Sequence, residues 1–105
     1  MAQEYVDTKI QADKVVIFIK ESCPYCVQVQ DVLNKYDFKQ GKLEIHDITG
    51  HADMKAIQDY FHNKTGAKTV PRVFIGTECV GGGSDVKQLH DNAVLKDKLI
   101  AIGAI

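Results

Sequence analysis

The fold of this chain is decided by the stretch Val15-Val16-Ile17-Phe18-Ile19-Lys20-Glu21-Ser22-Cys23-Pro24-Tyr25-Cys26. Its first five residues are consecutive apolar β-formers, which is the pattern of a strand buried on both faces of a sheet. After Pro24, apolar side chains recur at i, i+3, i+4 and i+7, namely at Val29, Val32, Leu33 and Tyr36. The sequence therefore predicts a strand over residues 14–20, a short turn, and an amphipathic helix over 24–36.

Two cysteines stand where the predicted strand meets the predicted helix. Side chains at i and i+3 are neighbours on a helix, so Cys23 and Cys26 are close enough to form a disulfide. Pro24 suits the first helical position, which leaves Cys23 at the cap, facing unpaired N–H groups and the positive end of the helix dipole. Such surroundings lower the pKa of a cysteine from about 8.5 to about 3.5–7.5. We expect Cys23 to be the nucleophilic thiolate and the more shielded Cys26 to be the resolving thiol.

The composition limits the classes of function. A chain of 105 residues is expected to form one domain, over residues 1–105, whose core needs no disulfide staples. A net charge of -1 with mixed signs argues against nucleic acid or an anionic membrane as the main partner. No stretch approaches the roughly 20 apolar residues of a membrane span, and residues 1–7 show no signal-peptide pattern. We expect a cytoplasmic protein, in which a C-x-x-C beside a strand–helix–strand pattern indicates redox chemistry.

Predicted strands and helices alternate along the rest of the chain. They are a short helix near residues 5–10, a strand over 43–48, a helix from Met54 to a C-terminal cap at Gly66, a hairpin of strands 73–75 and 79–80, and helices over 84–90 and 94–102. A right-handed crossover makes the first two strands parallel, and the hairpin adds antiparallel strands. The predicted fold is α/β: a thioredoxin-like fold with a central four-stranded mixed β-sheet flanked by helices on both faces.

Zinc binding is an alternative use of paired cysteines. Zinc needs four ligands, usually from two paired clusters, but Cys79 stands alone and the four histidines form no spaced pair. We expect no metal site, Cys79 as a small core residue, and the histidines at the surface or its boundary. A further alternative, a pair of inert buried thiols, would require the strand–turn–helix context to be coincidental.

Two later segments offer backbone groups to a ligand. Pro71 forces Val70 into an extended conformation, which allows strand addition by a peptide-like ligand, although a simple strand-entry proline is an equal alternative. From the residues alone the bond before Pro71 is expected to be trans, since cis occurs at about 5–6% of such bonds. In Gly81-Gly82-Gly83-Ser84-Asp85, Ser84 or Asp85 is expected to cap the next helix. The unpaired N–H groups at the start of that helix suit an anion. The alternative to an anion site is a flexible turn followed by a helix cap.

Three segments together resemble the signature of dithiol glutaredoxins of the CPYC type. They are Cys23-Pro24-Tyr25-Cys26, Thr69-Val70-Pro71-Arg72-Val73-Phe74-Ile75-Gly76 and Gly81-Gly82-Gly83-Ser84-Asp85. The likeness is closest to the vertebrate cytosolic members and covers nearly the whole chain, from Met1 onward. It implies a glutathione-dependent disulfide oxidoreductase that reduces protein–glutathione mixed disulfides and protein disulfides, with glutathionylated or disulfide-bonded proteins as partners.

The same resemblance implies a groove that binds glutathione as the co-substrate. The matching residues are Lys20, Tyr25, Gln58, Thr69, Val70, Pro71, Ser84 and Asp85. It further implies a cis bond before Pro71 and backbone pairing between Val70 and the cysteinyl residue of glutathione. Lys20 and Gln58 would face the glycine carboxylate, and the Ser84–Asp85 turn would hold the γ-glutamyl end. Lys68 replaces an arginine common in the family, which keeps the charge but loses the bidentate fork.

Some family features differ, and rival functions stay open. Thr8 and Gly83 stand where mammalian cytosolic members usually carry cysteines, so accessory disulfides are less expected, and we expect a monomer. The rivals are a thioredoxin or disulfide isomerase, an iron–sulfur carrier such as some glutaredoxin relatives, and a non-catalytic interaction module. Pro24 and Tyr25 stiffen and fill the site, which makes a bridging cluster less expected.

Overall fold

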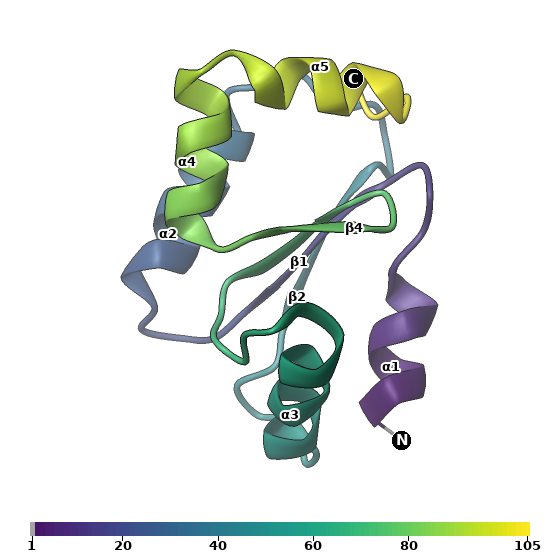
Figure 1. The fold of residues 1–105 in the computed structure, drawn as a ribbon, viewed down its shortest axis with the longest axis vertical. Coiled ribbons are helices and arrows are strands. Elements are labelled where there is room, and N and C mark those ends of the chain that lie inside the picture. The colour runs from purple at the N-terminus through teal and green to yellow at the C-terminus, as the bar shows by residue number, and fades with distance from the viewer. Residues whose placement is uncertain (1) are drawn as a thin grey trace.

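A computed structural model describes residues 2–105, so Met1, the first residue of the predicted domain, lies outside the described residues. The elements, in chain order, are α1 (Ala2–Lys9), β1 (Val15–Ile19), α2 (Pro24–Leu33), β2 (Leu43–Asp47), α3 (Met54–Thr65), β3 (Arg72–Ile75), β4 (Glu78–Gly81), α4 (Gly83–Asp91) and α5 (Val94–Ala101) (Figure 1). Among residues 2–105, none of the helices combines the length and apolar character that a membrane crossing requires.

The sheet is mixed, and its strands lie in the order β2-β1-β3-β4. β1 runs parallel to β2, with Val15 opposite Leu43, and antiparallel to β3. β3 and β4 form the predicted antiparallel hairpin, with a register shift at Val73 and Phe74. The unbroken apolar run of β1 is explained by its position between two strands, where its first four residues are buried.

Helices cover both faces of the sheet, as predicted (Figure 1). On one face, Ile17 of β1 packs in a core with side chains of α2, α4 and α5. On the other face, Phe18 packs with Phe61 of α3 and Val6 of α1. Because successive residues of a strand point to opposite faces, one strand contributes to both cores. The four-stranded thioredoxin-like architecture is therefore confirmed.

The end of α2 differs from the prediction. The helix ends at Leu33 and not at Tyr36. The chain leaves it through tighter i to i+3 hydrogen bonds, in which the N–H groups of Lys35 and Tyr36 donate at 3.1 Å to the carbonyls of Val32 and Leu33. Tyr36 still packs against the core, and its hydroxyl lies 2.6 Å from Nδ1 of His90. The apolar spacing therefore continues beyond the α-helix itself.

The sheet register brings the three predicted motifs to one end of the molecule. Phe18 pairs with Arg72, so the segment before β3 lies beside the loop between β1 and α2. Val73 pairs with Gly81, which brings the start of α4 to the same place.

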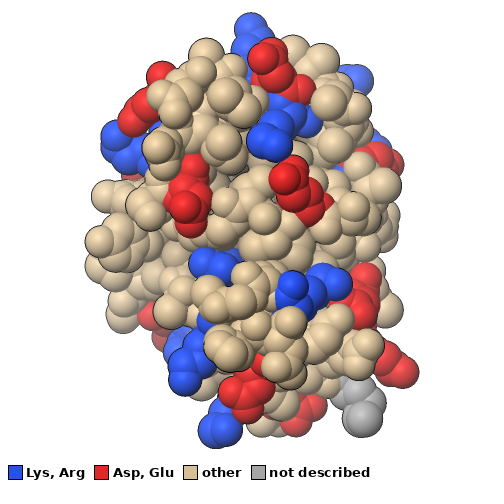
Figure 2. All heavy atoms as spheres, in the orientation of Figure 1, with Lys and Arg blue, Asp and Glu red and all other residues tan. Residues whose placement is uncertain are grey.

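Figure 2 shows acidic and basic side chains interspersed among uncharged ones on the face it presents. That nucleic acid and membranes are not partners stays a prediction.

Candidate functional site

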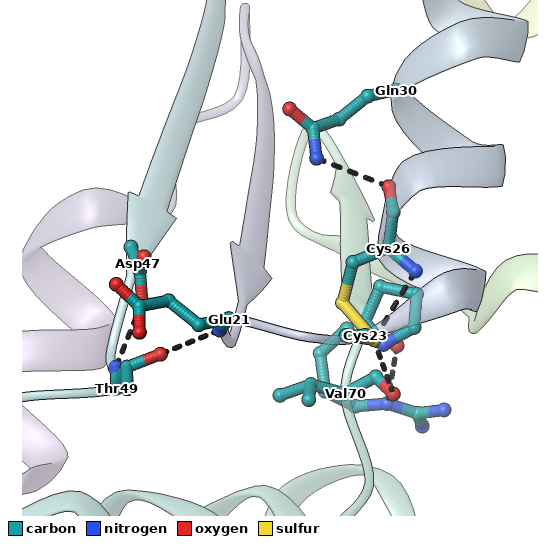
Figure 3. The surroundings of a disulfide bond; sticks show 9 residues. Glu21, Cys23, Cys26, Gln30, Asp47, Thr49 and Val70 are labelled. Atoms are coloured by element: carbon teal, nitrogen blue, oxygen red, sulfur yellow. Dashed lines mark hydrogen bonds between the residues drawn. A yellow bond between two sulfur atoms is a disulfide. The ribbon is translucent and has the colours of Figure 1, made fainter.

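Cys23 and Cys26 form a disulfide at the start of α2 (Figure 3). Their Cα atoms are 5.2 Å apart. Cys23 is the N-cap, with extended backbone, and Pro24 occupies the first turn. The N–H of Cys26 donates to Sγ of Cys23 at 3.2 Å. The predicted cap geometry is confirmed. It places the Cys23 sulfur in contact with a first-turn N–H that has no acceptor within the helix.

The two cysteines differ in accessibility. Cys23 is half-buried, whereas Cys26 is only 1% exposed. No acidic residue lies in the first turn of α2, so no side-chain charge there offsets the positive end of the helix dipole. The Cys23 sulfur is therefore the more accessible of the two, and it lies at the positive end of the α2 dipole.

The Val70 backbone lies directly beside the active-site sulfur. Its carbonyl oxygen is 3.9 Å from Sγ of Cys23, although the two residues are far apart in the sequence. The Val70–Pro71 peptide bond is cis, as the family resemblance implied, so the trans expectation drawn from the residues alone is wrong. A peptide whose cysteinyl residue paired with the Val70 backbone would have its sulfur near Cys23, because the Val70 carbonyl lies beside Sγ of Cys23.

A cavity of about 400 Å³ extends from this point toward the start of α4. It is lined by Tyr25, Thr69, Val70, Pro71, Arg72, Gly82, Gly83, Ser84 and Asp85. Six residues of the predicted groove therefore meet in one cavity: Tyr25, Thr69, Val70, Pro71, Ser84 and Asp85. Segments from three separate parts of the chain form it, because the sheet register aligns them.

Two predicted groove residues lie elsewhere. Lys20 lines a second cavity of about 450 Å³, together with Cys23 and Cys26. Gln58 lines neither cavity, and its amide donates a 3.1 Å hydrogen bond to the carbonyl of Lys68. The structure thus does not bring Lys20 and Gln58 into the cavity that holds the other six residues.

The glycine-rich segment caps α4 differently from the prediction. The N-cap is Gly82 and the helix begins at Gly83, so neither Ser84 nor Asp85 occupies the cap position. Asp85 acts from inside the first turn, where its carboxylate accepts a 2.9 Å hydrogen bond from the N–H of Gly82. Gly81 has a φ of 113°, and a Cβ there would overlap the Asp85 carboxylate. Glycine is needed at Gly81 both for the backbone conformation and for this close approach.

Sequence reasoning assigned no role to Arg72, which also lines the 400 Å³ cavity. Arg72 is only 7% exposed, and its Nε donates at 3.3 Å to the carbonyl of Pro71. One signal was available in the sequence. Arg72 is the only charged residue in the otherwise apolar run 70–75, and a charge inside a buried segment requires a partner.

The remaining metal and cysteine predictions concern residues outside the cavity. In residues 2–105 no group of three or more His, Cys, Asp or Glu side chains has an arrangement that could hold a metal ion. Cys79 is partly buried and packs against the core shared by α1 and α3. His46 and His90 are half-buried and contact Glu44 and Tyr36, respectively. His46 and His90 therefore lie at the core boundary, as expected, whereas Cys79 lies at the edge of the core and is not fully buried in it.

Comparison with known proteins places the chain in one family. The glutaredoxin family profile matches residues 15–80, which is more than half of the chain. Glutaredoxin-1 of Rattus norvegicus is 52% identical over 105 residues, covering 100% of this chain and 98% of the rat protein. Glutaredoxin-1 of Homo sapiens is 51% identical over 105 residues, covering 100% of this chain and 99% of the human protein.

Solved structures agree with the sequence comparison. Oxidized glutaredoxin 2 of Chlamydomonas reinhardtii has a TM-score of 0.90 and 34% identity, with 99% of this chain and 95% of the algal chain covered. The buckwheat glutaredoxin–glutathione complex has a TM-score of 0.90 and 30% identity, with 100% of this chain and 93% of the buckwheat chain covered. Fold, cysteine geometry and similarity along the whole chain lead to one conclusion: this protein belongs to the glutaredoxin family.

Proposed function

We propose that this protein reduces protein–glutathione mixed disulfides and protein disulfides, with glutathione as co-substrate, Cys23 as nucleophile and Cys26 as resolving thiol. One observation carries the proposal. The accessible sulfur of the pair sits on the N-terminus of α2, 3.9 Å from the carbonyl oxygen of Val70, a residue that lines the 400 Å³ cavity, while its partner is 1% exposed. Membership of the glutaredoxin family supports the same chemistry.

The reduction of a mixed disulfide needs only Cys23. Its thiolate attacks the glutathione sulfur, the bond between glutathione and the substrate breaks, and the substrate leaves as a thiolate. A second glutathione thiolate then attacks the glutathione sulfur now bound to Cys23. This step releases glutathione disulfide and restores the Cys23 thiolate. In each cycle the substrate sulfur is reduced and two glutathione sulfurs end as one disulfide.

The reduction of a protein disulfide also needs Cys26. The Cys23 thiolate first forms a mixed disulfide with one substrate sulfur and frees the other as a thiolate, which takes up a proton. Cys26 then loses its proton to solvent and attacks Cys23, which releases the second substrate thiolate. The product is the Cys23–Cys26 disulfide seen in the structure. Two glutathione molecules reduce it and leave as glutathione disulfide.

The cavity beside Val70 suits an extended anionic peptide. Val70 offers backbone groups next to Cys23, Tyr25 and Thr69 line the walls, and Pro71 fixes the strand entry. We propose that Ser84 and Asp85 hold the γ-glutamyl end of glutathione at the start of α4. Lys20 and Gln58 remain candidates for the glycine carboxylate, and each would have to turn toward a peptide that extends beyond this cavity.

Substitution of each cysteine tests the proposed division of labour. Cys26→Ser should keep the reduction of a glutathionylated peptide and lose the reduction of a protein disulfide. Cys23→Ser should abolish both activities, and Cys79→Ser, whose sulfur packs against the core, should keep both. Equal loss of both activities in Cys23→Ser and Cys26→Ser would refute the assignment.

The partners and location are proposed on the same basis. Glutathionylated and disulfide-bonded proteins would be the substrates, and the protein would act as a monomer in the cytoplasm. A reducing compartment keeps a C-x-x-C pair available for turnover. Light scattering of the reduced protein would test the monomer, since a mass of twice 11.7 kDa would contradict it.

A further inference from the structure

Arg72 is a buried cation without an anionic partner. The residue is 7% exposed. Among residues 2–105 no carboxylate lies within 4.0 Å of its guanidinium, and its hydrogen bond is the single 3.3 Å contact from Nε to the carbonyl of Pro71. A buried charge is expensive unless it is paired with an opposite charge. An arginine in this state is therefore expected to acquire an anion from outside the chain.

The free end of the guanidinium is open to the cavity. Every fully buried side-chain nitrogen in the described residues has a hydrogen-bond partner, so the Nη groups, which make no such bond, must keep accessible surface. Arg72 lines the 400 Å³ cavity beside Val70. Its unused N–H donors thus face the space where we place glutathione.

The position of the guanidinium next to α4 indicates which part of a ligand it would meet. A Cβ placed on Gly82 would lie 3.1 Å from Nη2 of Arg72, so the guanidinium lies beside the N-cap of α4. The first N–H groups of that nine-residue helix are unpaired and carry partial positive charge. The carboxylate of Asp85 lies close by and accepts from the Gly82 N–H. Donors for a carboxylate and an acceptor for an ammonium group therefore stand side by side.

We infer that Arg72, which lines the 400 Å³ cavity, binds the α-carboxylate at the γ-glutamyl end of glutathione, while Asp85 faces the neighbouring ammonium group. This inference rests on the proposed function and adds to it a residue that selects for an amino-acid headgroup. A γ-glutamyl group carries both charges on one carbon, and a simple acyl group carries neither. Planar guanidinium donors match a carboxylate in a way that a lysine ammonium does not.

The test compares Arg72→Gln with Arg72→Lys and with Lys96→Gln, an exposed control on α5. Arg72→Gln should raise the KM for glutathione roughly 10-fold or more, the loss expected for a charge-assisted hydrogen bond, and leave kcat nearly unchanged. Arg72→Lys should fall between Arg72→Gln and the unsubstituted protein, and Lys96→Gln should match the unsubstituted protein. Since the cation is unpaired without ligand, Arg72→Gln should not lower the thermal midpoint of the free protein.

A second substrate isolates the contact. 4-Aminobutyryl-cysteinyl-glycine is glutathione without the α-carboxylate, so the unsubstituted protein should use it with a raised KM. Arg72→Gln should then cause no further loss with this peptide. An equal effect of Arg72→Gln on both peptides, or no effect on either, would overturn the inference. If the unsubstituted protein does not turn over glutathione at all, the proposed function fails, and this result is distinguishable from the loss of one contact.

Discussion

The Thr49 hydroxyl accepts a 2.6 Å hydrogen bond from the backbone N–H of Glu21, two residues before the active-site Cys23 (Figure 3). Thr49 is itself held in place, because its N–H donates at 2.8 Å to Oδ1 of Asp47. Hydrogen bonds from Thr49 keep the pKa of the Asp47 carboxyl below its ordinary value. The bond from the Thr49 side chain contributes most, and the bond from its backbone N–H contributes next. The segment after β2 thereby holds the loop that carries Cys23.

The held loop is strained. Ser22, between Glu21 and Cys23, has a φ of 55°, which is left-handed and costs a residue with a Cβ about 1–2 kcal/mol. A single hydrogen bond contributes about 0.5–1.5 kcal/mol, a comparable amount. The free energy of the Thr49–Glu21 hydrogen bond is therefore comparable to the strain at Ser22. Loss of this bond would be enough to shift the loop away from the conformation that keeps Cys23 at the cap of α2.

Removal of the Thr49 hydroxyl should weaken the reactivity of Cys23. Thr49→Val should slow alkylation of reduced Cys23 at neutral pH roughly 2- to 10-fold, the population shift expected from one lost hydrogen bond. Thr49→Ser keeps the oxygen and should react like the unsubstituted protein. Stopped-flow measurement with iodoacetamide on Cys26→Ser/Cys79→Ser backgrounds, in which Cys23 is the remaining cysteine, gives the rate.

Relief of the strain provides an independent control. Ser22→Gly removes the cost of the positive φ, so it should restore most of the rate when combined with Thr49→Val. If Thr49→Val and Thr49→Ser react at the same rate, or if Ser22→Gly makes no difference to Thr49→Val, the hydrogen bond does not position Cys23.

Gly81→Ala should weaken glutathione binding. The added Cβ would overlap the Asp85 carboxylate and break the capping of α4 beside the cavity. The KM for glutathione should rise severalfold, and stability should fall by about 1–3 kcal/mol, as for other overpacked sites. Gly41→Ala is the matched control, because Gly41 also has a positive φ of 78° but no atom within 4 Å of a Cβ. A rise in KM with Gly41→Ala as large as with Gly81→Ala would show that strain alone is responsible.

The Lys14–Glu44 pair predicts a pH-dependent part of the stability. The Lys14 ammonium, hydrogen-bonded to Glu44, holds the pKa of that carboxyl below its ordinary value in the folded protein. A lowered folded-state pKa stabilises the fold above the unfolded value of about 4.3, and this contribution is lost as pH falls through the folded-state pKa. Lys14→Met should therefore lower the free energy of unfolding by up to about 1 kcal/mol at pH 7. The loss should be smaller at pH 3.

Urea denaturation at both pH values measures this difference. Lys55→Met is the control, because Lys55 pairs with Asp59 on the surface and is 91% exposed, so its removal should change little at either pH. A loss for Lys14→Met that is the same at pH 3 as at pH 7 would contradict the ion pair as its source.

Much of the fold could be predicted from the sequence because local patterns and global topology agree. The apolar run of β1 indicated a central strand, and Pro24 after Cys23 indicated a helix start with a cysteine cap. These features depend on residues adjacent in sequence. The end of α2 was predicted too late, because Tyr36 keeps its core contact through a tighter turn that spacing alone does not distinguish from a helix.

Parts of the candidate site depend on contacts that span the chain. The role of Asp85 could be assigned only once the structure showed that the N-cap of α4 is Gly82 and not Ser84. The burial of Arg72 required the hairpin register that brings Gly82 beside it. Gln58 faces the Lys68 carbonyl because of how the segment after α3 folds back. No periodicity within one element carries this information.

The most direct measurement is the pH dependence of Cys23 alkylation in Cys26→Ser/Cys79→Ser protein, with and without S-methylglutathione, which cannot exchange thiols. If the α2 amides hold the Cys23 sulfur as an anion beside the cavity, the rate should reach half its maximum well below the pH of about 8.5 of an ordinary cysteine. S-methylglutathione should slow the reaction. A midpoint near 8.5, or a rate that S-methylglutathione leaves unchanged, would contradict the proposed site.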